Sequence, residues 1–433
     1  MMGRRLALVA ALALLLTCGP TAVPRPDGNT PSATAGAIAS TDVITLREGG
    51  ADSALALRKV ASGELVRSVG DGTLLPDGTT LISVSAAGAS STLIKKIDRR
   101  TGVTVTSRTV DGNWQSPRTG PGLTGLSADG SHVVLFGSSY NYTDASGAWT
   151  ARTTFGIVDL ASWHVDTVQL EGRYSFEAIS NDGSSLYLGE SLPVQLPTGT
   201  RLRVYDVGTQ KLTDVGGDVV PDLNESYRTP VVNAGVFSFS LFAGKTPMIV
   251  RFDLAHRAAR LMPLPAGQAV EGELMLMWSL VPTRDGRTLY AINPAAGVVD
   301  EIDTAALTVR RTARLDASKS EIDLVRVLAA ALHPIADAKM GFATGAVLSS
   351  DESTLFALAE TGLLAVDTVS LTSHRLTNDR PYESLRLSPD GRRIYVLGRE
   401  DGVITALDAR DGSVLGRMPR IAFPSEIVAV DAN

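Results

Sequence analysis

Cysteine, histidine and aromatic residues are scarce in the sequence. Cys18 is the single cysteine among 433 residues, which excludes a disulfide within the chain and an iron–sulfur site built from four thiolates. The five histidines are His132, His164, His256, His333 and His374. None stands two or four residues from another His or a Glu, the spacing of common metal motifs. We interpret them as solvated or packed residues, with His333 at the end of a predicted helix.

Charge and missing motifs narrow the function classes further. Aromatic residues make up 5% of the chain, and the formal net charge is -6. No basic stripe is present, so a nucleic-acid partner is not expected. The sequence also lacks a Gly-rich phosphate loop before a helix and a GxSxG nucleophile elbow. Its composition therefore predicts no familiar catalytic centre.

The first residues predict export. Arg4 and Arg5 precede an unbroken apolar run, LALVAALALLL, which is typical of a signal peptide and short for a bilayer span. Cys18 follows in LLTCG, which resembles the bacterial lipobox, where the cysteine is lipidated and becomes the new N-terminus. The alternative is an incidental cysteine within a cleaved signal peptide. No later segment of the sequence is apolar enough to predict a second membrane span.

These features divide the chain into three parts. Residues 1–18 are the predicted signal peptide, and residues 19–40, rich in Pro, Ser, Thr, Ala and Gly, are a predicted flexible tether. Residues 41–433 are the predicted folded domain. We expect an exported protein on the outer side of the bacterial cytoplasmic membrane, anchored through a lipid on Cys18, or otherwise secreted.

Two short signals alternate along the predicted domain. The first is a turn such as SPDG between apolar segments, which begins at Leu74, Leu126, Ile179, Val231, Pro282, Leu348 and Leu387. The second is an apolar residue followed by Asp and a turn, at Asp98, Asp159, Asp206, Asp253, Asp303, Asp367 and Asp408. Each unit contains four short predicted strands, and the units repeat about every 40 to 65 residues. This pattern predicts the blades of an all-β propeller. Asp390, Gly391 and Asp408 recur in nearly every unit, so we interpret them as turn residues and not as catalytic ones.

The two ends of the domain predict how the ring closes. Residues 41–70 contain three strand segments but no opening one, and residues 422–431 match an opening strand. The C-terminal strand should therefore complete the N-terminal blade and remove an exposed sheet edge. This arrangement counts eight blades. Seven are the alternative, if the N-terminal segment only extends a neighbouring blade.

Two segments interrupt the repeat. Residues 318–339 predict an inserted helix near 318–333, because apolar residues recur at helical spacing and Pro334 would end it. Residues 138–153 predict an enlarged loop.

LSPDGRRIYV and the following ITALDARDGSVLGR resemble the YVTN-type β-propeller repeat of bacterial surface and periplasmic proteins, related to WD40 repeats. Tyr290 to Asn293 and Tyr395 to Leu397 are variants of the strand that names this family. The resemblance covers roughly residues 41–431 and implies a propeller. Because such propellers include lactonases, quinoprotein-like folds and pure binding scaffolds, it does not imply one function.

A few singular residues are candidates for a site. Asp222 and Glu225, in PDLNES, and Glu271 and Glu273, in VEGE, could supply oxygen ligands for Ca²⁺ at the mouth of the ring, although the spacing is not that of an EF-hand. Solvated loop acids are the competing interpretation, and we expect no cofactor. Trp114 and Trp149 lie in polar stretches, where they would act as recognition anchors or pack between blades. Asn141 and Asn224 stand in glycosylation sequons, which carry little weight beside a bacterial leader.

Two hypotheses about function follow. The first is a non-catalytic binding or scaffold propeller that binds an envelope protein or a cell-wall component. The alternative is a propeller enzyme, a lactonase-like hydrolase or a quinoprotein-like dehydrogenase, with its metal or cofactor at the mouth of the central channel. The lack of a catalytic constellation favours the first.

Overall fold

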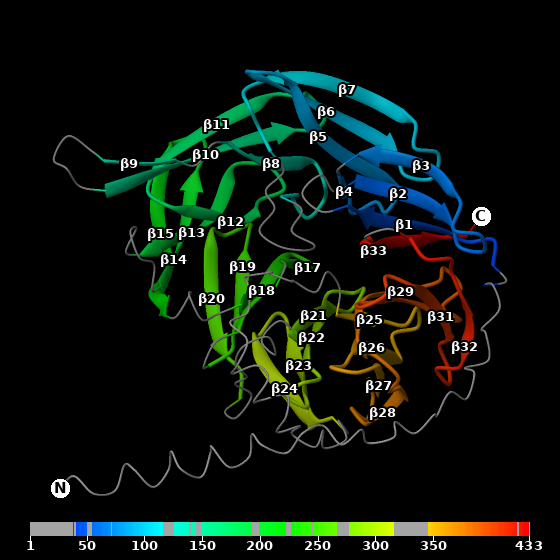
Figure 1. The fold of residues 1–433 in the computed structure, drawn as a ribbon. Coiled ribbons are helices and arrows are strands. Elements are labelled where there is room, and N and C mark those ends of the chain that lie inside the picture. The colour runs from blue at the N-terminus through cyan, green and yellow to red at the C-terminus, as the bar shows by residue number, and fades with distance from the viewer. Residues whose placement is uncertain are drawn as a thin grey trace, which may run out of the picture. The chain divides into compact units, whose positions relative to one another are not determined.

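The alternating apolar segments of the sequence form short antiparallel strands, which assemble into eight sheets around a central axis (Figure 1). The computed structural model describes residues 38–432 except 39, 50–53, 71, 116–124, 138–139, 144–148, 193–198, 222–226, 230, 244–245, 266–276, 316–344 and 422–423. Residues 36–433 form a unit separate from residues 1–35. The prediction of an all-β propeller with eight blades is confirmed, and the alternative of seven is wrong.

We number the blades along the chain and give their strands from the axis outward. Blade 1 contains β33 (Pro424–Asp431), β1 (Val43–Glu48), β2 (Ala54–Lys59) and β3 (Leu65–Gly70). Blade 2 contains β4 (Gly72–Leu74), β5 (Thr80–Gly88), β6 (Ser91–Asp98) and β7 (Thr104–Asp111). Blade 3 contains β8 (His132–Phe136), β10 (Trp149–Asp159) and β11 (Val165–Glu171), with β9 (Tyr140–Thr143) paired to β10. Blade 4 contains β12 (Tyr174–Ile179), β13 (Ser185–Leu192), β14 (Gly199–Asp206) and β15 (Lys211–Pro221).

The second half of the ring continues the same order. Blade 5 contains β16 (Tyr227–Arg228) and β17 (Val232–Ala234), both paired to β18 (Phe237–Ala243), then β19 (Met248–Asp253) and β20 (Ala258–Pro263). Blade 6 contains β21 (Ser279–Pro282), β22 (Thr288–Asn293), β23 (Val298–Asp303) and β24 (Thr308–Arg314). Blade 7 contains β25 (Ala346–Leu348), β26 (Thr354–Leu358), β27 (Leu363–Asp367) and β28 (Ser373–Thr377). Blade 8 contains β29 (Tyr382–Leu387), β30 (Arg393–Gly398), β31 (Ile404–Asp408) and β32 (Val414–Arg417).

The last strand of the chain closes the ring. β33 pairs antiparallel with β1, from Val43 opposite Asp431 to Glu48 opposite Pro424. Figure 1 shows the red C-terminal strand beside the blue N-terminal one. The predicted closure is therefore confirmed, and it gives the inner edge of β1 a backbone partner that the N-terminal segment does not supply.

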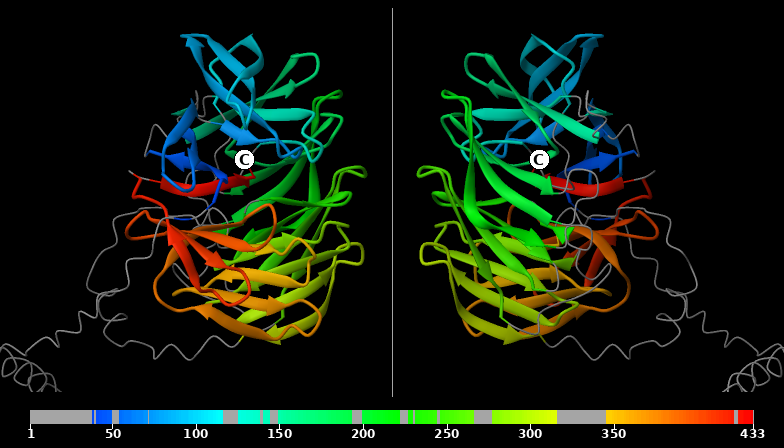
Figure 2. Two further views of the ribbon diagram at one scale, coloured as in Figure 1. Left: turned by 90° about the vertical axis from the view of Figure 1, so that its right-hand side faces the viewer. Right: turned by 90° about the vertical axis from the view of Figure 1, so that its left-hand side faces the viewer.

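Apolar side chains pack between neighbouring blades. Eight buried clusters are present among the described residues, one at each junction of adjacent blades. Seen from the side, the blades are twisted sheets that stand face to face (Figure 2). Each cluster is built from both facing sheets, so a blade buries its apolar faces only as part of the ring. The cluster between blades 1 and 2 is the smallest, with Leu55, Leu81 and Ile97 as its buried members.

Two departures from a regular blade occur near the predicted enlarged loop. In blade 3 the innermost position is held by isolated bridges, from Gln115 to Phe136 and from Leu126 to Val133, and not by a strand. In the same blade, β9 and the start of β10 form a paired extension within residues 138–153. The predicted helix near 318–333 and the predicted tether at 19–40 lie outside the described residues, save for the last residues of the tether.

Candidate functional site at the loop face of blade 8

The two faces of the ring have different connections. Because antiparallel strands alternate in direction, the turn from first to second strand and the turn from third to fourth strand lie at one end of a blade. We call this end the turn face. The connection from second to third strand and the passage to the next blade lie at the other end, the loop face. The repeated Asp and Gly signals of the sequence all belong to the turn face.

The turn-face carboxylates are occupied by their own turns. In the turn between β29 and β30, Asp390 accepts hydrogen bonds from the Ser388 hydroxyl at 2.5 Å and the Arg392 backbone at 3.0 Å. These bonds, the Ser388 one first, lower the pKa of Asp390. In the next turn, Asp408 accepts bonds from Arg410, whose side chain contributes most to lowering the pKa of Asp408 to about 2. The structure thus supports the interpretation of Asp390 and Asp408 as turn residues.

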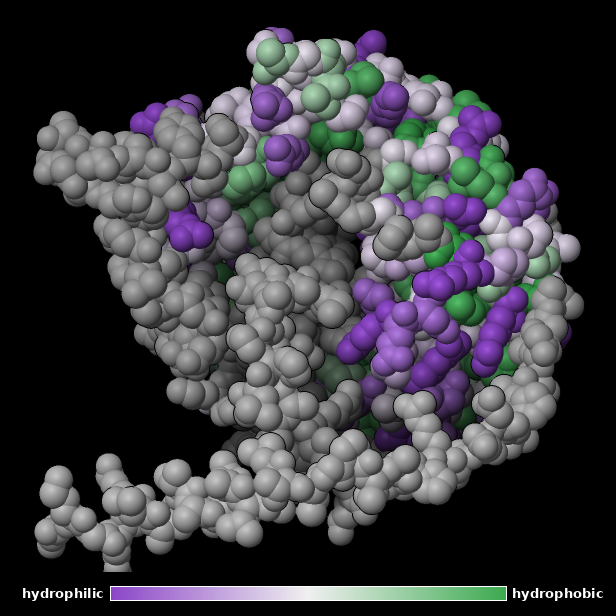
Figure 3. All heavy atoms as spheres, viewed as in Figure 1, coloured by the Kyte–Doolittle hydropathy of each residue, from purple (hydrophilic) through white to green (hydrophobic). Residues whose placement is uncertain are grey.

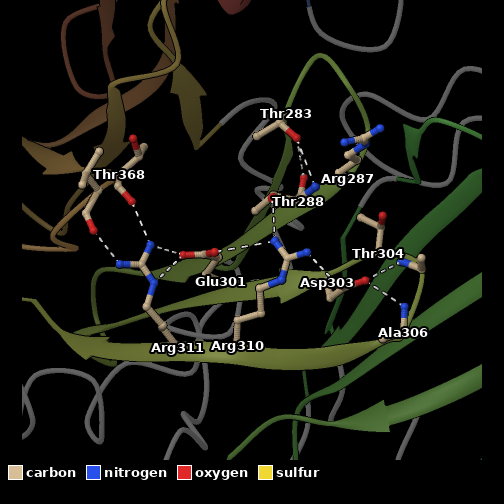
Figure 4. Close-up of polar contacts among 12 residues, drawn as sticks. Thr283, Arg287, Thr288, Glu301, Asp303, Thr304, Ala306, Arg310, Arg311 and Thr368 are labelled. Atoms are coloured by element: carbon tan, nitrogen blue, oxygen red, sulfur yellow. Dashed lines mark hydrogen bonds and ion pairs between the residues drawn. The ribbon is translucent and has the colours of Figure 1, made fainter.

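A polar network at the junction of blades 6 and 7 is also structural (Figure 4). Arg311 of β24 contacts Glu301 of β23 and donates to the backbone carbonyls of Thr368 at 3.0 Å and Val369 at 2.5 Å. Beside it, Arg310 pairs with Asp303 at 2.5 Å. The Arg311 guanidinium of blade 6 therefore holds the outer turn of blade 7 through two hydrogen bonds.

The same arrangement recurs around the ring. Side chains of three other blades donate to outer-turn carbonyls of the following blade: Lys96 to Leu160 at 2.8 Å, Tyr187 to Asp253 at 2.8 Å and Arg251 to Thr304 at 3.1 Å. Because these side chains already form hydrogen bonds between adjacent blades, we do not assign them to a ligand site.

Several predicted site residues lie beyond the part of the chain that the structure describes. These are Cys18, Asp222, Glu225, Glu271, Glu273, His333 and Asn224. Their predicted roles in lipidation or Ca²⁺ binding stay predictions. Trp149 and Asn141 lie in β10 and β9, and only their backbone is described. Trp114 is 8% exposed within the cluster between blades 2 and 3, which supports the packing interpretation for this residue.

The described histidines do not come together. His132, at the start of β8, has its Nδ1 2.9 Å from the Ser131 hydroxyl. His164, His256 and His374 are exposed and belong to blades 3, 5 and 7. Within the described ranges, no group of three or more His, Cys, Asp or Glu residues is placed to hold a metal ion. The same part of the chain contains no helix with the length and apolar character of a membrane span.

Polar side chains gather on the loop face of blade 8. We define the blade 8 cluster as Asp379, Arg380, Tyr382, Glu383, Arg399 and Asp401. Hydrophilic side chains cover this part of the ring in Figure 3. This cluster was not predicted from the sequence, because its residues come from two separate segments of the repeat and form no motif.

Arg380, in the passage from blade 7 to blade 8, organises the cluster. Its guanidinium pairs with Asp401 and donates to the Thr405 hydroxyl at 2.7 Å. The same guanidinium lies 5.6 Å from the centroid of the Tyr382 ring, within range of a cation–π contact. Tyr382 in turn donates to Asp379 at 3.0 Å. Burial, and then the charge of Asp379, raise the pKa of Tyr382.

Glu383 adds a third carboxyl to this cluster. It falls at a register shift between Tyr382 and Ser384 on the innermost strand, where the pairing with β30 skips one residue. Such bulges re-aim a side chain and are frequent near active sites. Burial raises the pKa of the Glu383 carboxyl, and the charge of Arg399 opposes that rise. The result is a half-buried carboxyl on the strand nearest the axis, at the loop face.

Two further arginines near the axis, Arg386 and Arg47, contact the strands that close the ring. Arg386 of β29 donates to the Val428 carbonyl of β33 at 3.1 Å. Arg47 bridges blades 1 and 2. Its Nε lies 3.1 Å from a Glu426 oxygen in blade 1, and its Nη2 donates to the Gly72 carbonyl in blade 2 at 3.2 Å. Burial lowers the pKa of Arg386, and the charge of Glu426 opposes this effect. These side chains satisfy backbone groups at the free inner edges of the first strands.

A small hollow lies on the opposite side of the axis, between the inner strands of blades 3, 4 and 5. Leu126, Phe176 and Asn233 are among its lining residues, together with Glu177. The Glu177 side chain is fully buried and accepts a hydrogen bond from Ser175 at 2.9 Å. A Cβ on Gly189 would lie 2.6 Å from the Glu177 carboxylate, so this glycine makes room for the buried acid.

Comparisons with known proteins identify the fold and no family. No protein-family model matches the sequence, and no curated protein matches it. Solved structures with a similar fold include apo AztD from Citrobacter koseri, with a TM-score of 0.49 at 11% identity, covering 90% of this chain and 97% of that one. Another is the dihydro-heme d1 dehydrogenase NirN in complex with DHE, with a TM-score of 0.48 at 15% identity, covering 98% and 85%.

A third similar structure is PpgL, the periplasmic gluconolactonase of Pseudomonas aeruginosa, with a TM-score of 0.39 at 18% identity, covering 80% of this chain and 97% of that one. These proteins differ in what their names describe, a lactonase beside a dehydrogenase. The likeness therefore concerns the propeller fold alone, and no residue of this chain takes a role from it.

Proposed function

We propose that the protein is an exported, non-catalytic binding propeller of the YVTN type, anchored by a lipid on Cys18. The loop face at blade 8 would bind an envelope protein or a cell-wall component. The observation that carries this proposal is the contrast between the two faces. On the turn face the repeated carboxylates cap turns, whereas the loop face of blade 8 presents a half-buried Glu383 with a raised pKa.

The blade 8 cluster suits recognition of a polar partner. Arg380 is held by Asp401 and Thr405, and Asp379 accepts a hydrogen bond from the buried Tyr382, so the charged groups are oriented before a partner arrives. Preorganised polar groups lose little conformational entropy on binding. Sugar hydroxyls and peptide amides of a cell-wall fragment offer both donors and acceptors, which mixed acidic and basic side chains can match.

A thermal melt with defined probes tests the proposal. We would melt the chain from residue 19 onward with soluble peptidoglycan fragments, Ca²⁺, EDTA and pyrroloquinoline quinone. A ligand at about 100 times its Kd stabilises the folded state by about 2.7 kcal/mol. The expected result is a shift with peptidoglycan fragments that is lost in Glu383→Gln.

The matched control is Asp411→Asn, which changes an exposed carboxylate of the same blade on the turn face. It should keep the ligand-induced shift. A shift shared by all variants would place the site elsewhere. A shift with a metal or quinone, or turnover of a lactone or redox substrate at an enzyme-like rate, would instead favour the alternative of a propeller enzyme.

A further inference from the structure

Exposed apolar side chains concentrate on one arc of the outer rim. Among the described residues, eight large apolar side chains are exposed by more than two fifths, and six of them lie at the outer strands of three consecutive blades: Leu65 and Val66 in blade 1, Val103 and Val105 in blade 2, and Val414 and Leu415 in blade 8. Val105 is the most exposed of these six at 68%. We call these six residues the apolar arc. The other two, Val236 and Val369, stand singly in turns of blades 5 and 7. Clustered apolar exposure of this kind marks an interaction surface, whereas scattered exposure does not.

The arc is continuous because each outer strand abuts the turn of the next blade. A Cβ on Gly63, in the outer turn of blade 1, would lie 3.4 Å from Pro419, which follows β32. A Cβ on Gly102, in the outer turn of blade 2, would collide with Arg67 of β3. β32, β3 and β7 therefore succeed one another around the rim. Figure 1 shows them in this order, and Figure 3 shows hydrophobic side chains among hydrophilic ones there.

Other blades do not share this character. Seven residues after the position of the repeated Asp, which is Lys59 in blade 1, the arc carries Val66, Val105 and Leu415. At the same position the other five blades carry Asp166, Thr213, Arg260, Arg310 and His374. A repeat whose copies are otherwise alike has thus become apolar on three neighbouring copies. Packing does not account for the difference, because the six side chains point to solvent.

The described chain begins beside this arc. Ile38 is buried between blades 8 and 1 with Tyr395 and Met418. Four residues later, Asp42 accepts a hydrogen bond from Tyr395 at 2.6 Å, and its carbonyl accepts one from the Val60 backbone at 2.9 Å. Val60 belongs to the turn that leads directly into Leu65 and Val66.

This position matters because the predicted lipid anchor is only a short tether away. Ile38 stands twenty positions after Cys18, and a random coil of that length spans about 25 Å on average. A bilayer that holds the acyl chains is therefore within reach of the apolar arc. Among the described exposed side chains of blades 1 and 2, four are basic (Lys59, Arg67, Arg100 and Arg108) and three are acidic (Glu64, Asp77 and Asp111). This small excess of positive charge favours an anionic lipid surface.

We infer that the apolar arc of blades 8, 1 and 2 docks onto the surface of an anionic lipid bilayer. Aliphatic side chains would enter the headgroup region while the arginines meet phosphates. The inference rests on the proposed anchor only for placing the bilayer nearby. Docking would leave the blade 8 cluster, at the loop face, to bind a partner.

Co-sedimentation with vesicles tests the inference without the anchor. The chain from residue 19 onward, which has no acyl chain, is mixed with vesicles of phosphatidylglycerol and phosphatidylcholine in equal parts, and with phosphatidylcholine alone. We expect binding to the anionic vesicles that weakens as salt is raised. The double variant Val66→Asp/Val105→Asp should lower the bound fraction by about threefold or more, because buried carboxylates oppose insertion.

The matched control is Val236→Asp. Val236 is 72% exposed, in a turn of blade 5 away from the arc, and its variant should bind like the unmodified protein. Equal binding by all variants, or no binding to either vesicle, would overturn the inference. So would a concentration-dependent dimer in solution that the double variant abolishes, because the arc would then cover a second copy. Since no cell-wall ligand is involved, the result is independent of the ligand proposed for the blade 8 cluster.

Discussion

At the scale of single residues, Glu383 has an environment that folding alone does not explain. A carboxyl whose pKa is raised by burial lowers the stability of the folded state at neutral pH, because ionisation is easier in the unfolded chain. Sites that tolerate such a loss are frequently functional. Here the neighbouring Arg399 reduces the loss but does not reverse it.

Glu383→Gln should therefore raise the melting temperature at pH 7. A raised folded pKa means that stability is complete below the unfolded pKa, near 4.5, and falls as pH rises through the folded pKa. The glutamine variant lacks this fall, so the gain, about 1–2 °C after screening by solvent, should vanish near pH 4. Melting curves at both pH values check this, with the exposed Glu400→Gln as control. An equal shift at pH 4 and pH 7 would contradict the assignment.

At the scale of elements, the turn between third and fourth strands explains the sequence repeat. In each blade the fourth residue after the position of the repeated Asp has a positive φ: Gly63, Gly102, Trp163, Gln210, Arg257, Leu307, Leu371 and Gly412. The Asp side chain stabilises the turn by accepting backbone hydrogen bonds, as Asp303 does from Ala305 and Ala306. The Asp compensates for the unfavourable backbone conformation wherever glycine is absent.

Gln210→Gly and Gly412→Ala should change stability in opposite directions. Gln210 is exposed with φ of 56°, so glycine there relieves strain and should stabilise the protein by about 0.5–1 kcal/mol. At Gly412, with φ of 72°, a Cβ would lie 2.4 Å from the Leu376 carbonyl of blade 7. The alanine variant should lose more than about 1 kcal/mol. Urea unfolding of both variants measures this, and a loss for Gln210→Gly would contradict the strain.

The same elements show what the sequence could and could not predict. The turns were predictable because Asp, Gly and Ser bond locally, within a few residues. The positive φ of Leu307 and Leu371 was not predicted, because large residues rarely adopt it. The bulge that carries Glu383 was also hidden, since it depends on the register between β29 and β30. The blade 8 cluster depends on that register, so the sequence did not predict it.

At the scale of the whole molecule, the ring is held by unequal junctions. The first and last strands meet in blade 1, where β33 is joined to β1 by backbone pairing and by the ion pair of Arg47 with Glu426. The adjoining junction with blade 2 has the smallest apolar cluster. It has in addition a buried ion pair, in which Arg99 donates to Asp431 at 2.5 Å, with both side chains less than a tenth exposed. Closure was predictable from the missing and extra strands, but this pair, which joins positions 332 residues apart, was not.

Asp431→Ala tests how far closure depends on that pair. Removing one partner leaves the Arg99 charge buried, which costs about 3 kcal/mol, whereas Asp411→Ala at an exposed turn should cost less than about 1 kcal/mol. Because every blade buries its faces against two neighbours, a weakened blade 1–2 junction should lower the stability of the whole ring in one transition.

Urea unfolding followed by circular dichroism should show an earlier midpoint with an unchanged slope. Leucine at both positions should recover much of the loss, because an apolar pair needs no desolvation of charge. A separate early transition would instead mean that the N-terminal blades unfold on their own and that the ring is not a single cooperative unit.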